Sequence, residues 1–363
     1  MMKFTVNQRE FSDALAIASK AIISKTPLDI LKGFYLEAYE NELTITGNNL
    51  EIGIRTSIDA AVETEGKSVI DAKILSDIIR KLPNEEVTVS IKDGNVLLQC
   101  QKLKFTIKEM LDNGFPTVDE LEEAVYQNIH PAILEEMIKK THFAVTTDET
   151  KPVFMGELVE LEDNQMNVIA LDGFRLAYKK CELKSSVGSR SMIIPGKTMV
   201  EIMRLCQTME EDVKIGIEDR HASFLFGRTL VNTQLIQGEF SKYEEIIPKE
   251  FSTKIKVNRQ KFIDALDRAT LVSKNYLVKL RIQNDELLIT AHDNEVGNLE
   301  EILDVELEGK NLEIAFNIRF FLDSLKVMED EYIYMNFNTN VSPCIIKPEF
   351  ETDYTYLVLP VRI

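Results

Sequence analysis

The sequence has no tryptophan, few cysteines and histidines, and no long apolar run. Its four histidines form no HExxH motif and no close pair, which argues against a zinc-dependent enzyme. Its four cysteines include no CxxC pair, so we expect reduced, mostly buried thiols rather than a disulfide framework or a metal site. No stretch approaches the roughly 20 apolar residues of a membrane span, and the first residues lack the apolar segment of a signal peptide. These absences predict a soluble, cytoplasmic protein without a cofactor, a metal or a membrane partner.

The sequence also lacks an excess of positive charge. Its 42 Lys and Arg residues are outnumbered by 60 Asp and Glu residues, which gives a formal charge of −18. Such a balance argues at first against nucleic-acid binding, because Lys and Arg drive the association of proteins with phosphates. The distribution of the charge along the chain is therefore more informative than its sum.

Motifs that suggest an enzyme are incomplete. Gly196-Lys197-Thr198 resembles the end of a P-loop, but Ser191 stands where that loop needs a glycine, and Pro195 lies inside the would-be cradle. Adjacent acids such as Glu135 and Glu136 are expected on a solvated face. The sequence predicts no catalytic site, and a hydrolase with a buried acid pair is only a third alternative.

An internal repeat organises the chain. The segment NVIALDGFRLAYKK reads as a β-hairpin, and LTITGNNLEIGI and LLITAHDNEVGNLEEIL follow the same pattern of strand, turn and strand. Asn49, Asp172 and Asp293 occupy matching places, 123 and 121 residues apart. Because 363 residues suggest two or three domains, this period predicts three copies, over residues 1–126, 127–251 and 252–363.

Each copy is predicted to contain two helices and several antiparallel strands, so the expected fold class is α+β. The predicted helices span residues 8–25, 71–81, 130–140, 197–206, 259–274 and 317–328. Together they carry a formal charge of +6, which leaves −24 for the strands and loops. Helix propensity does not explain this sign, because Glu forms helices as well as Lys does. If the helices line one surface, that surface is basic and suited to DNA.

Four segments carry a resemblance to a known family. These are KFTV at Lys3–Val6, ALDGFRLA around Asp172, QGEFSKYEEIIP at Gln237–Pro248 and the terminal YLVLPVRI. With the threefold repeat, they resemble the bacterial sliding clamps, the beta subunits of DNA polymerase III. The resemblance implies a ring-shaped, head-to-tail homodimer that encircles double-stranded DNA without regard to sequence, with helices inside and sheets outside. It also implies partners: the replicative polymerase, the clamp loader and other proteins with a clamp-binding motif.

The resemblance assigns three sets of residues. The DNA-binding candidates, of which the first, second and fifth match family positions and the others lie on or beside the helices, are Lys25, Lys73, Arg80, Lys139, Lys197, Arg204, Arg268 and Arg319. The partner-peptide pocket would be lined by Phe154, Leu171, Gly173, Phe174, Arg175, Leu176, Ile246, Val341, Pro343, Val358, Leu359, Pro360, Val361 and Arg362. The dimer contact would join Phe105 and Ile107 to Leu271 and Val272.

The number of helices supports a dimer if the ring exists. Helices pack roughly 8 to 10 Å apart, so six would leave a bore of about 7 Å, narrower than the ~12 Å major groove, whereas twelve would leave about 24 Å. Two chains are then the smallest workable ring. The alternative from another class is a three-repeat scaffold or recognition protein that never meets DNA.

The pocket departs from the family pattern. Leu171 and Phe174 replace the usual Thr and His, and Glu245 stands where some relatives have Arg. Aliphatic walls suit Leu or Phe anchors of a short peptide, and Arg175 and Arg362 are expected to hold its polar groups. We therefore expect a preference for more apolar or less acidic peptides than in relatives with His and Arg.

Overall fold

The structure is a computed structural model that describes residues 1–111, 114–121, 125–184 and 188–362. The chain forms two compact units. The first comprises Met1–Pro131 and Arg204–Leu235, and the second comprises Ala132–Met203 and Ile236–Ile363. Within the described ranges, no helix combines the length and apolarity needed to cross a membrane.

The α-helices of the described residues begin close to where they were predicted, and three of them end earlier. They are α1 (Gln8–Ala18), α2 (Ala72–Lys81), α3 (Pro131–Thr141), α4 (Gly196–Cys206), α5 (Tyr243–Ile246), α6 (Arg259–Thr270) and α7 (Ile318–Leu325). Asn7, Asn258 and Asn317 precede α1, α6 and α7, and their side chains accept hydrogen bonds from the first backbone N–H groups. The short helix α5 was not predicted.

The early helix ends correct the charge calculation. After α1 the chain turns as a 3-10 helix over Ser19–Ala21 and then becomes extended. Lys25, Lys274 and Lys326 therefore lie beyond the last α-helical turns. The six observed helices that correspond to the predicted ones carry a formal charge of +3 rather than +6. The sign of the prediction is right and its size was too large.

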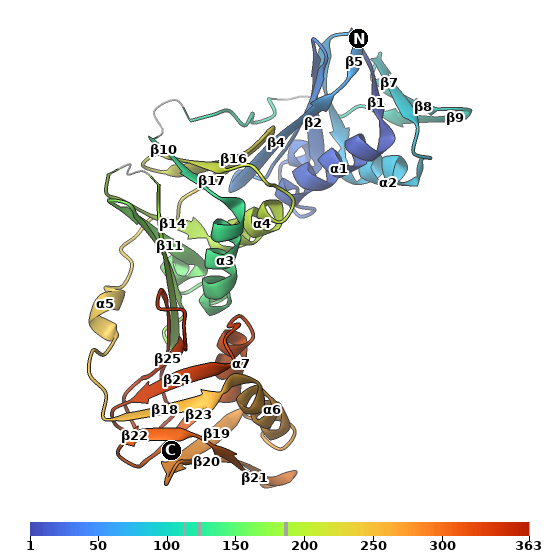
Figure 1. Cartoon of the computed structure of the whole chain (residues 1–363). Helices are drawn as coiled ribbons and strands as arrows, with labels where there is room; N and C mark the ends of the chain where they lie inside the picture. Colours follow the sequence, from blue (N-terminus) through green and yellow to red (C-terminus); the bar gives the residue numbers. More distant parts are fainter. Residues whose placement is uncertain (112–113, 122–124, 185–187, 363) are drawn as a thin grey trace. The chain divides into compact units, whose positions relative to one another are not determined.

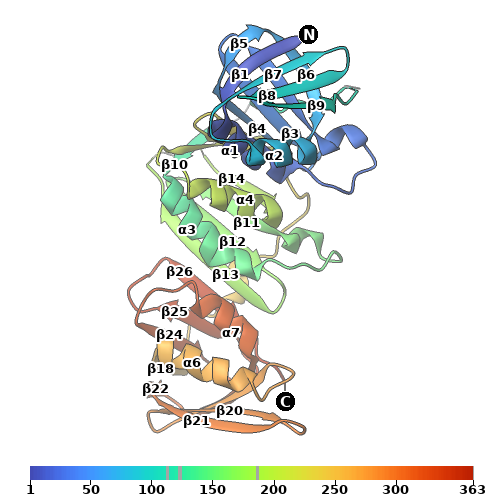
Figure 2. The ribbon, with the colours of Figure 1, turned by 90° about the vertical axis from the view of Figure 1, so that its right-hand side faces the viewer.

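Two antiparallel sheets form the first unit. The five-stranded sheet has the order β5 (Ala61–Thr64), β1 (Met2–Asn7), β7 (Glu86–Lys92), β8 (Asn95–Cys100) and β9 (Leu103–Lys108). The eight-stranded sheet has the order β10 (Val125–Ile129), β15 (Val213–Ile217), β16 (His221–Phe226), β17 (Thr229–Gln234), β4 (Ile52–Asp59), β3 (Glu42–Asn48), β2 (Gly33–Tyr39) and β6 (Gly66–Asp71). Helices α1 and α2 lie side by side and pack with both sheets around one apolar core (Figures 1 and 2).

The second unit follows the same plan. Its nine-stranded sheet has the order β14 (Arg190–Pro195), β11 (Gly156–Glu162), β12 (Gln165–Leu171), β13 (Arg175–Glu182), β26 (Tyr354–Val358), β25 (Cys344–Pro348), β24 (Tyr332–Phe337), β18 (Thr253–Asn258) and β22 (Glu306–Gly309). Its four-stranded sheet has the order β21 (Gly297–Asp304), β20 (Glu286–Asp293), β19 (Leu277–Gln283) and β23 (Leu312–Asn317). Helices α6 and α7 share one core with strands of both sheets. The predicted α+β class, with paired helices and antiparallel strands in each repeat, is confirmed.

Two of the sheets continue from one repeat into the next. The last strand of the middle repeat, β17, pairs with β4 of the first repeat, and we call this contact the first junction. The last strand of the chain, β26, pairs with β13 of the middle repeat, and we call this contact the second junction. Strands β9 and β21 hold the corresponding places in the first and last repeats. Each lies at the edge of its sheet, and neither pairs across a junction with another described strand.

Candidate partner-binding pocket and nucleic-acid interface

A turn held by one aspartate forms the edge of the predicted pocket. The carboxylate of Asp172 accepts hydrogen bonds from the backbone N–H groups of Phe174 and Arg175, at 2.8 and 3.0 Å. Gly173, which lies between Asp172 and Phe174, has φ +94°, a conformation that residues with a Cβ rarely adopt. Asp172 and Gly173 thus hold the turn, which leaves the ring of Phe174 56% exposed.

Arg175 is occupied inside the protein. Its Nε donates to Asp172 at 3.0 Å, one terminal nitrogen donates to Asp323 at 2.6 Å, and the other donates to the carbonyl of Phe143 at 2.7 Å. The guanidinium also lies 4.8 Å from the centre of the Phe320 ring. We expected Arg175 to hold polar groups of a peptide, but the structure gives it the task of fixing the turn and joining it to α7.

The residues after β26 lie directly beside this turn. The backbone N–H of Leu359 donates to the carbonyl of Phe174, and that of Val361 donates to the carbonyl of Ala315, each at 2.8 Å. Pro360 lies between these two bonds and has no N–H to donate. The segment after β26 is therefore held at two points and leaves its outer face to solvent, with Val361 40% exposed.

The predicted lining divides into a buried floor and an exposed rim. Phe154, Leu171, Leu176 and Leu359 belong to one apolar cluster, which makes them the floor. The exposed members, which we call the rim, are Gly173, Phe174, Ile246, Val341, Val361 and Arg362, whereas Pro343 and Pro360 are half-buried. Val358 is fully buried in the core of the last repeat, so it supports the pocket from behind.

Residues missed by the sequence prediction complete this surface. Phe320 stacks with Phe174 at 6.2 Å between ring centres, and Phe240 meets Phe154 edge to face at 5.6 Å. Tyr243 at the start of α5 donates its hydroxyl to Glu160 at 2.7 Å, and burial, together with this bond, raises its pKa. Phe240 and Tyr243 fall within the QGEFSKYEEIIP motif, which was a signal for them. Phe320 gave no such signal, because only the fold brings it next to Phe174.

A buried ionic cluster fastens the second junction beside the pocket. The ammonium of Lys179 on β13 lies 2.5 Å from Glu351, 2.9 Å from Asp353 and 3.1 Å from Glu136. Lys140 on α3 contacts Glu351 and Glu136 at 2.5 and 2.9 Å. Because both lysines are at least 95% buried, these carboxylates are essential partners.

The DNA-binding candidates are all exposed. The first unit contains Lys25, Lys73, Arg80 and Arg204, and the second contains Lys139, Lys197, Arg268 and Arg319. Two of them have competing partners, since Arg80 pairs with Asp77 at 2.7 Å and Arg268 makes a two-pronged contact with Glu301. Arg319 lies over the Tyr276 ring at 3.5 Å from its centre.

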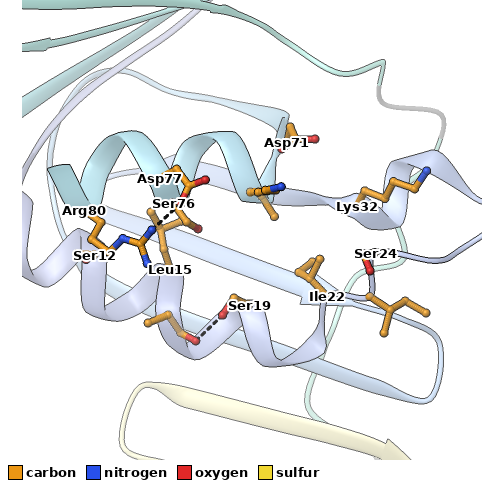
Figure 3. Close-up of a pocket in the computed structure, with 14 residues that line it drawn as sticks. Ser12, Leu15, Ser19, Ile22, Ser24, Lys32, Asp71, Ser76, Asp77 and Arg80 are labelled. Atoms are coloured by element: carbon orange, nitrogen blue, oxygen red, sulfur yellow. Dashed lines mark hydrogen bonds and ion pairs between the residues drawn. The ribbon is translucent and has the colours of Figure 1, made fainter. Parts of the chain in front are cut away.

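A groove of about 530 Å³ lies between α1 and α2, where Lys73 and Arg80 are found. Apolar side chains such as Leu15 and Ile22 line it together with serine hydroxyls, three cations and the two acids Asp71 and Asp77. Figure 3 shows Arg80 at one end of this groove and Lys32 at the other. The acids partly offset the cations of this groove, since Arg80 pairs with Asp77.

Comparisons with known proteins identify the family. The chain matches the models of the N-terminal, central and C-terminal domains of the DNA polymerase III beta subunit over residues 2–119, 128–242 and 244–362. It is 30% identical to the beta sliding clamp of Staphylococcus epidermidis over 375 residues, with all of both chains covered. These matches do not favour the alternative of a scaffold unrelated to DNA.

Solved structures agree. A putative DNA polymerase III beta subunit from Eubacterium rectale aligns with a TM-score of 0.96 at 31% identity over all of both chains. The DNA polymerase sliding clamp of Bacillus subtilis aligns with a TM-score of 0.96 at 28% identity, over 100% of this chain and 99% of that one. The chain belongs to the DNA polymerase III beta subunit family, the bacterial DNA sliding clamps.

Proposed function

We propose that two copies of this chain close head to tail into a ring around duplex DNA, and that the ring tethers a replicative polymerase and other partners in the cytoplasm without catalysing a reaction. The observation that supports the proposal is that β9 and β21, one edge strand of each end repeat, lack the pairing that the corresponding strands make at the two junctions. Each repeat ends in a strand of one kind (β9, β17, β26) and has a strand of a second kind after its first hairpin turn (β4, β13, β21). Two such pairs form within the chain. We infer that the third pair, β9 with β21, forms between two copies.

The chemistry of the two free strands is complementary. On β9, Phe105 is 40% exposed and Lys104 is exposed beside it. On β21, Glu300 is exposed and Leu299 is half-buried. If β9 and β21 pair in the register of the two internal junctions, Lys104 lies opposite Glu300 and Phe105 lies opposite Leu299. Leu271, at the end of α6, is 75% exposed and would be covered by the same contact. Ile107 and Val272 already pack against the cores of their own repeats and support this contact.

The division into three repeats, 1–126, 127–251 and 252–363, is part of this proposal. Its strongest support is the recurrence of the same hydrogen bond in each repeat. The N–H groups of Met110, Ile236 and Val361 donate to the carbonyls of Val69, Ile193 and Ala315, respectively. Three repeats per copy give two copies six pairs of helices.

We propose that DNA contact is electrostatic and independent of base sequence. Cations on helices meet phosphates, which carry no sequence information. Neutralising Lys73, Lys139 and Lys197 should weaken binding equally on unrelated duplexes and reduce the salt dependence by roughly one unit of slope for each cation removed from a phosphate. Arg268 should contribute less than these lysines, because Glu301 already neutralises it.

The test of the whole proposal is retention on a DNA circle. Protein loaded on a closed circular duplex should stay bound during gel filtration, and cutting the circle once should release it. The control is a cut circle whose ends are blocked by bound protein, on which the ring should remain. Protein that leaves the closed circle as fast as the cut one would refute the ring.

A charge exchange tests the closing contact. Lys104→Glu should shift the protein to monomer in sedimentation at micromolar concentration, and Glu300→Lys should do the same. The double variant should restore the dimer, because the opposite charges are exchanged. Lys249→Glu, which changes an exposed lysine elsewhere, is the matched control and should stay dimeric.

Deletion of residues 359–363 tests the pocket, although Ile363 lies outside the described residues. The truncated protein should lose binding of a pentapeptide clamp-binding motif and lose polymerase stimulation, since Leu359 contributes to the floor. It should keep the dimer and its retention on circular DNA. Phe174→His should shift the preference toward more acidic peptides. Unchanged affinity of the truncated protein would place the peptide site elsewhere.

A further inference from the structure

The first junction repeats the backbone of the second. The side chain of Asn49 accepts hydrogen bonds from the N–H groups of Glu51 and Ile52, at 3.0 and 2.9 Å, in the way that Asp172 holds its own turn. Leu50 has φ +75° at the place of Gly173. The two turns are therefore the same structure with different side chains.

The closing strands also correspond. The N–H of Gln234 donates to the carbonyl of Glu51 at 2.9 Å, as that of Leu359 does to Phe174. Across β16 and β17, His221 faces Gln234. By the same register, the residue of the second junction that corresponds to His221 is Pro343, because the next residue, Cys344, faces Val358.

A pocket of about 270 Å³ lies at the first junction, entirely within the first unit. Its lining includes Glu51, Leu121, His221 and Gln234. They correspond in order to Phe174, Ile246, Pro343 and Leu359, four residues assigned to the partner-peptide pocket. Leu121 is matched to Ile246 because each lies six residues after a phenylalanine, Phe115 in one case and Phe240 in the other. The two pockets are thus related by the internal repeat. The first is smaller than the range of roughly 300 to 1,000 Å³ typical of ligand sites, so it suits one anchor side chain.

The chemistry of the first pocket is different. Glu51 contributes the carboxylate of its lining. Asn232 donates from Nδ2 to the carbonyl of Asp119 at 2.7 Å, and its Oδ1 is buried with no hydrogen-bond partner among the described residues. The Glu51 carboxylate and Asn232 Oδ1 are both hydrogen-bond acceptors. Leu50, 49% exposed, adds an apolar rim.

We propose that the first junction is a second peptide-binding site, which takes the Arg or Lys side chain of a partner segment flanked by aliphatic residues. The cation pairs with Glu51 and donates to Asn232, while Leu50 and Leu121 contact the flanking side chains. The inference rests on the proposed peptide pocket of the second junction, because the repeat relates the two. One ring would then recognise two classes of partner, apolar segments at one site and basic ones at the other.

The test compares two peptides of equal size and opposite charge on the full chain. Acetyl-Leu-Arg-Leu-amide should bind and should bind more weakly as salt is added, whereas acetyl-Leu-Glu-Leu-amide should not bind. Glu51→Gln should weaken the basic peptide about tenfold, because it removes the charge from one hydrogen bond at an exposed position where folding is not at risk. Phe174→Ala is the matched control at the second junction and should leave this binding unchanged.

Other outcomes overturn the proposal and separate it from the proposed function. Equal binding of the two peptides, no effect of Glu51→Gln, or a loss with Phe174→Ala would show that the basic peptide has no site at the first junction. Absence of basic-peptide binding up to millimolar concentration would do the same. In each case acetyl-Leu-Leu-Phe-amide, titrated in parallel, reports on the second junction alone, so its binding and its loss with Phe174→Ala would leave the proposed function standing.

Discussion

At the second junction Lys179 lies opposite Tyr354 and reaches three carboxylates, whereas at the first junction Thr56 lies opposite Thr229. The two threonine hydroxyls share a buried hydrogen bond of 2.7 Å. Both positions are equivalent in the repeat. At these equivalent positions the strand pairing is fastened by an ionic cluster around a buried lysine in one junction and by a neutral hydrogen bond in the other. The ion pairs of Arg228 with Asp59 and Glu42 at the first junction are exposed.

The backbone geometry of the two junctions is thus the same, whereas the side chains on it differ. The backbone depends on an Asx turn and on the strand register, and Asn49 performs the same task as Asp172. The side chains beyond the turn are free to change, and Glu51 at one site corresponds to Phe174 at the other. An apolar, exposed rim suits peptide anchors, and a polar, smaller pocket suits a single cation.

The largest expected effect comes from the ionic cluster. Lys179→Ala should lower the free energy of unfolding by about 2 to 3 kcal/mol, because Asp353 loses its ion pair with Lys179 and the mostly buried Glu351 keeps only Lys140 as a cation. Urea unfolding of the variant and the parent protein measures this loss. A loss below about 1 kcal/mol would mean that water solvates the cluster.

Thr56→Ala is the matched change at the first junction. It leaves the Thr229 hydroxyl without its partner, so it should lower the free energy of unfolding by about 1 to 2 kcal/mol. The comparison requires this loss to be smaller than that of Lys179→Ala in the same urea titrations. The reverse order would contradict the view that buried charge makes the larger contribution to the junctions.

The sequence predicted the features that depend on local signals. The turns at Asn49 and Asp172, the starts of the helices and the alternation of the strands each depend on residues only a few positions apart. The sequence did not predict the occupation of Arg175, because its partners Asp323 and Phe143 lie 148 and 32 residues away. The early end of α1 was missed for another reason: its apolar spacing continues to Ile22, although the backbone no longer forms α-helical bonds there.

The candidate pocket was predicted from the family resemblance rather than from local pattern. Residue type alone would have placed YLVLPVRI in an ordinary edge strand. The first-junction pocket was not predicted, since its walls come from β4, β17 and the segment around Leu121, which the repeat relates to the second junction only after the registers are known.

A smaller effect is expected at the turns. Gly173→Leu should lower the free energy of unfolding by about 1 to 2 kcal/mol, because a side chain is placed in the left-handed conformation. Leu50→Gly should raise it by less than about 1 kcal/mol, since the relief of strain is opposed by the greater freedom of glycine in the unfolded chain. Thermal unfolding of both variants measures the difference. If both changes destabilise equally, the two turns are not equivalent in energy.

The smallest effect is a dependence on pH confined to the second junction. Burial alone would raise the pKa of Glu136, but hydrogen bonds and charge from Lys140 and Lys179 outweigh burial and hold it below its ordinary value of 4.5. A carboxylate whose pKa is lower in the folded state stabilises the fold above the unfolded-state pKa, and this contribution is lost as the pH falls through the folded-state pKa. Glu136 should therefore stabilise the protein at pH 7 and cease to do so in acid.

Glu136→Gln isolates this contribution. The variant should be less stable than the parent at pH 7, and the difference in urea midpoint should shrink steadily below pH 4.5, because the parent loses the same charge by protonation. Glu149→Gln, at an exposed site of the same unit, is the control and should give no difference that depends on pH in this way. A gap between Glu136→Gln and the parent that stays constant down to pH 3 would mean that Glu136 acts through packing rather than charge. The cluster would then resemble the neutral Thr56–Thr229 contact of the first junction more closely than its lysines suggest.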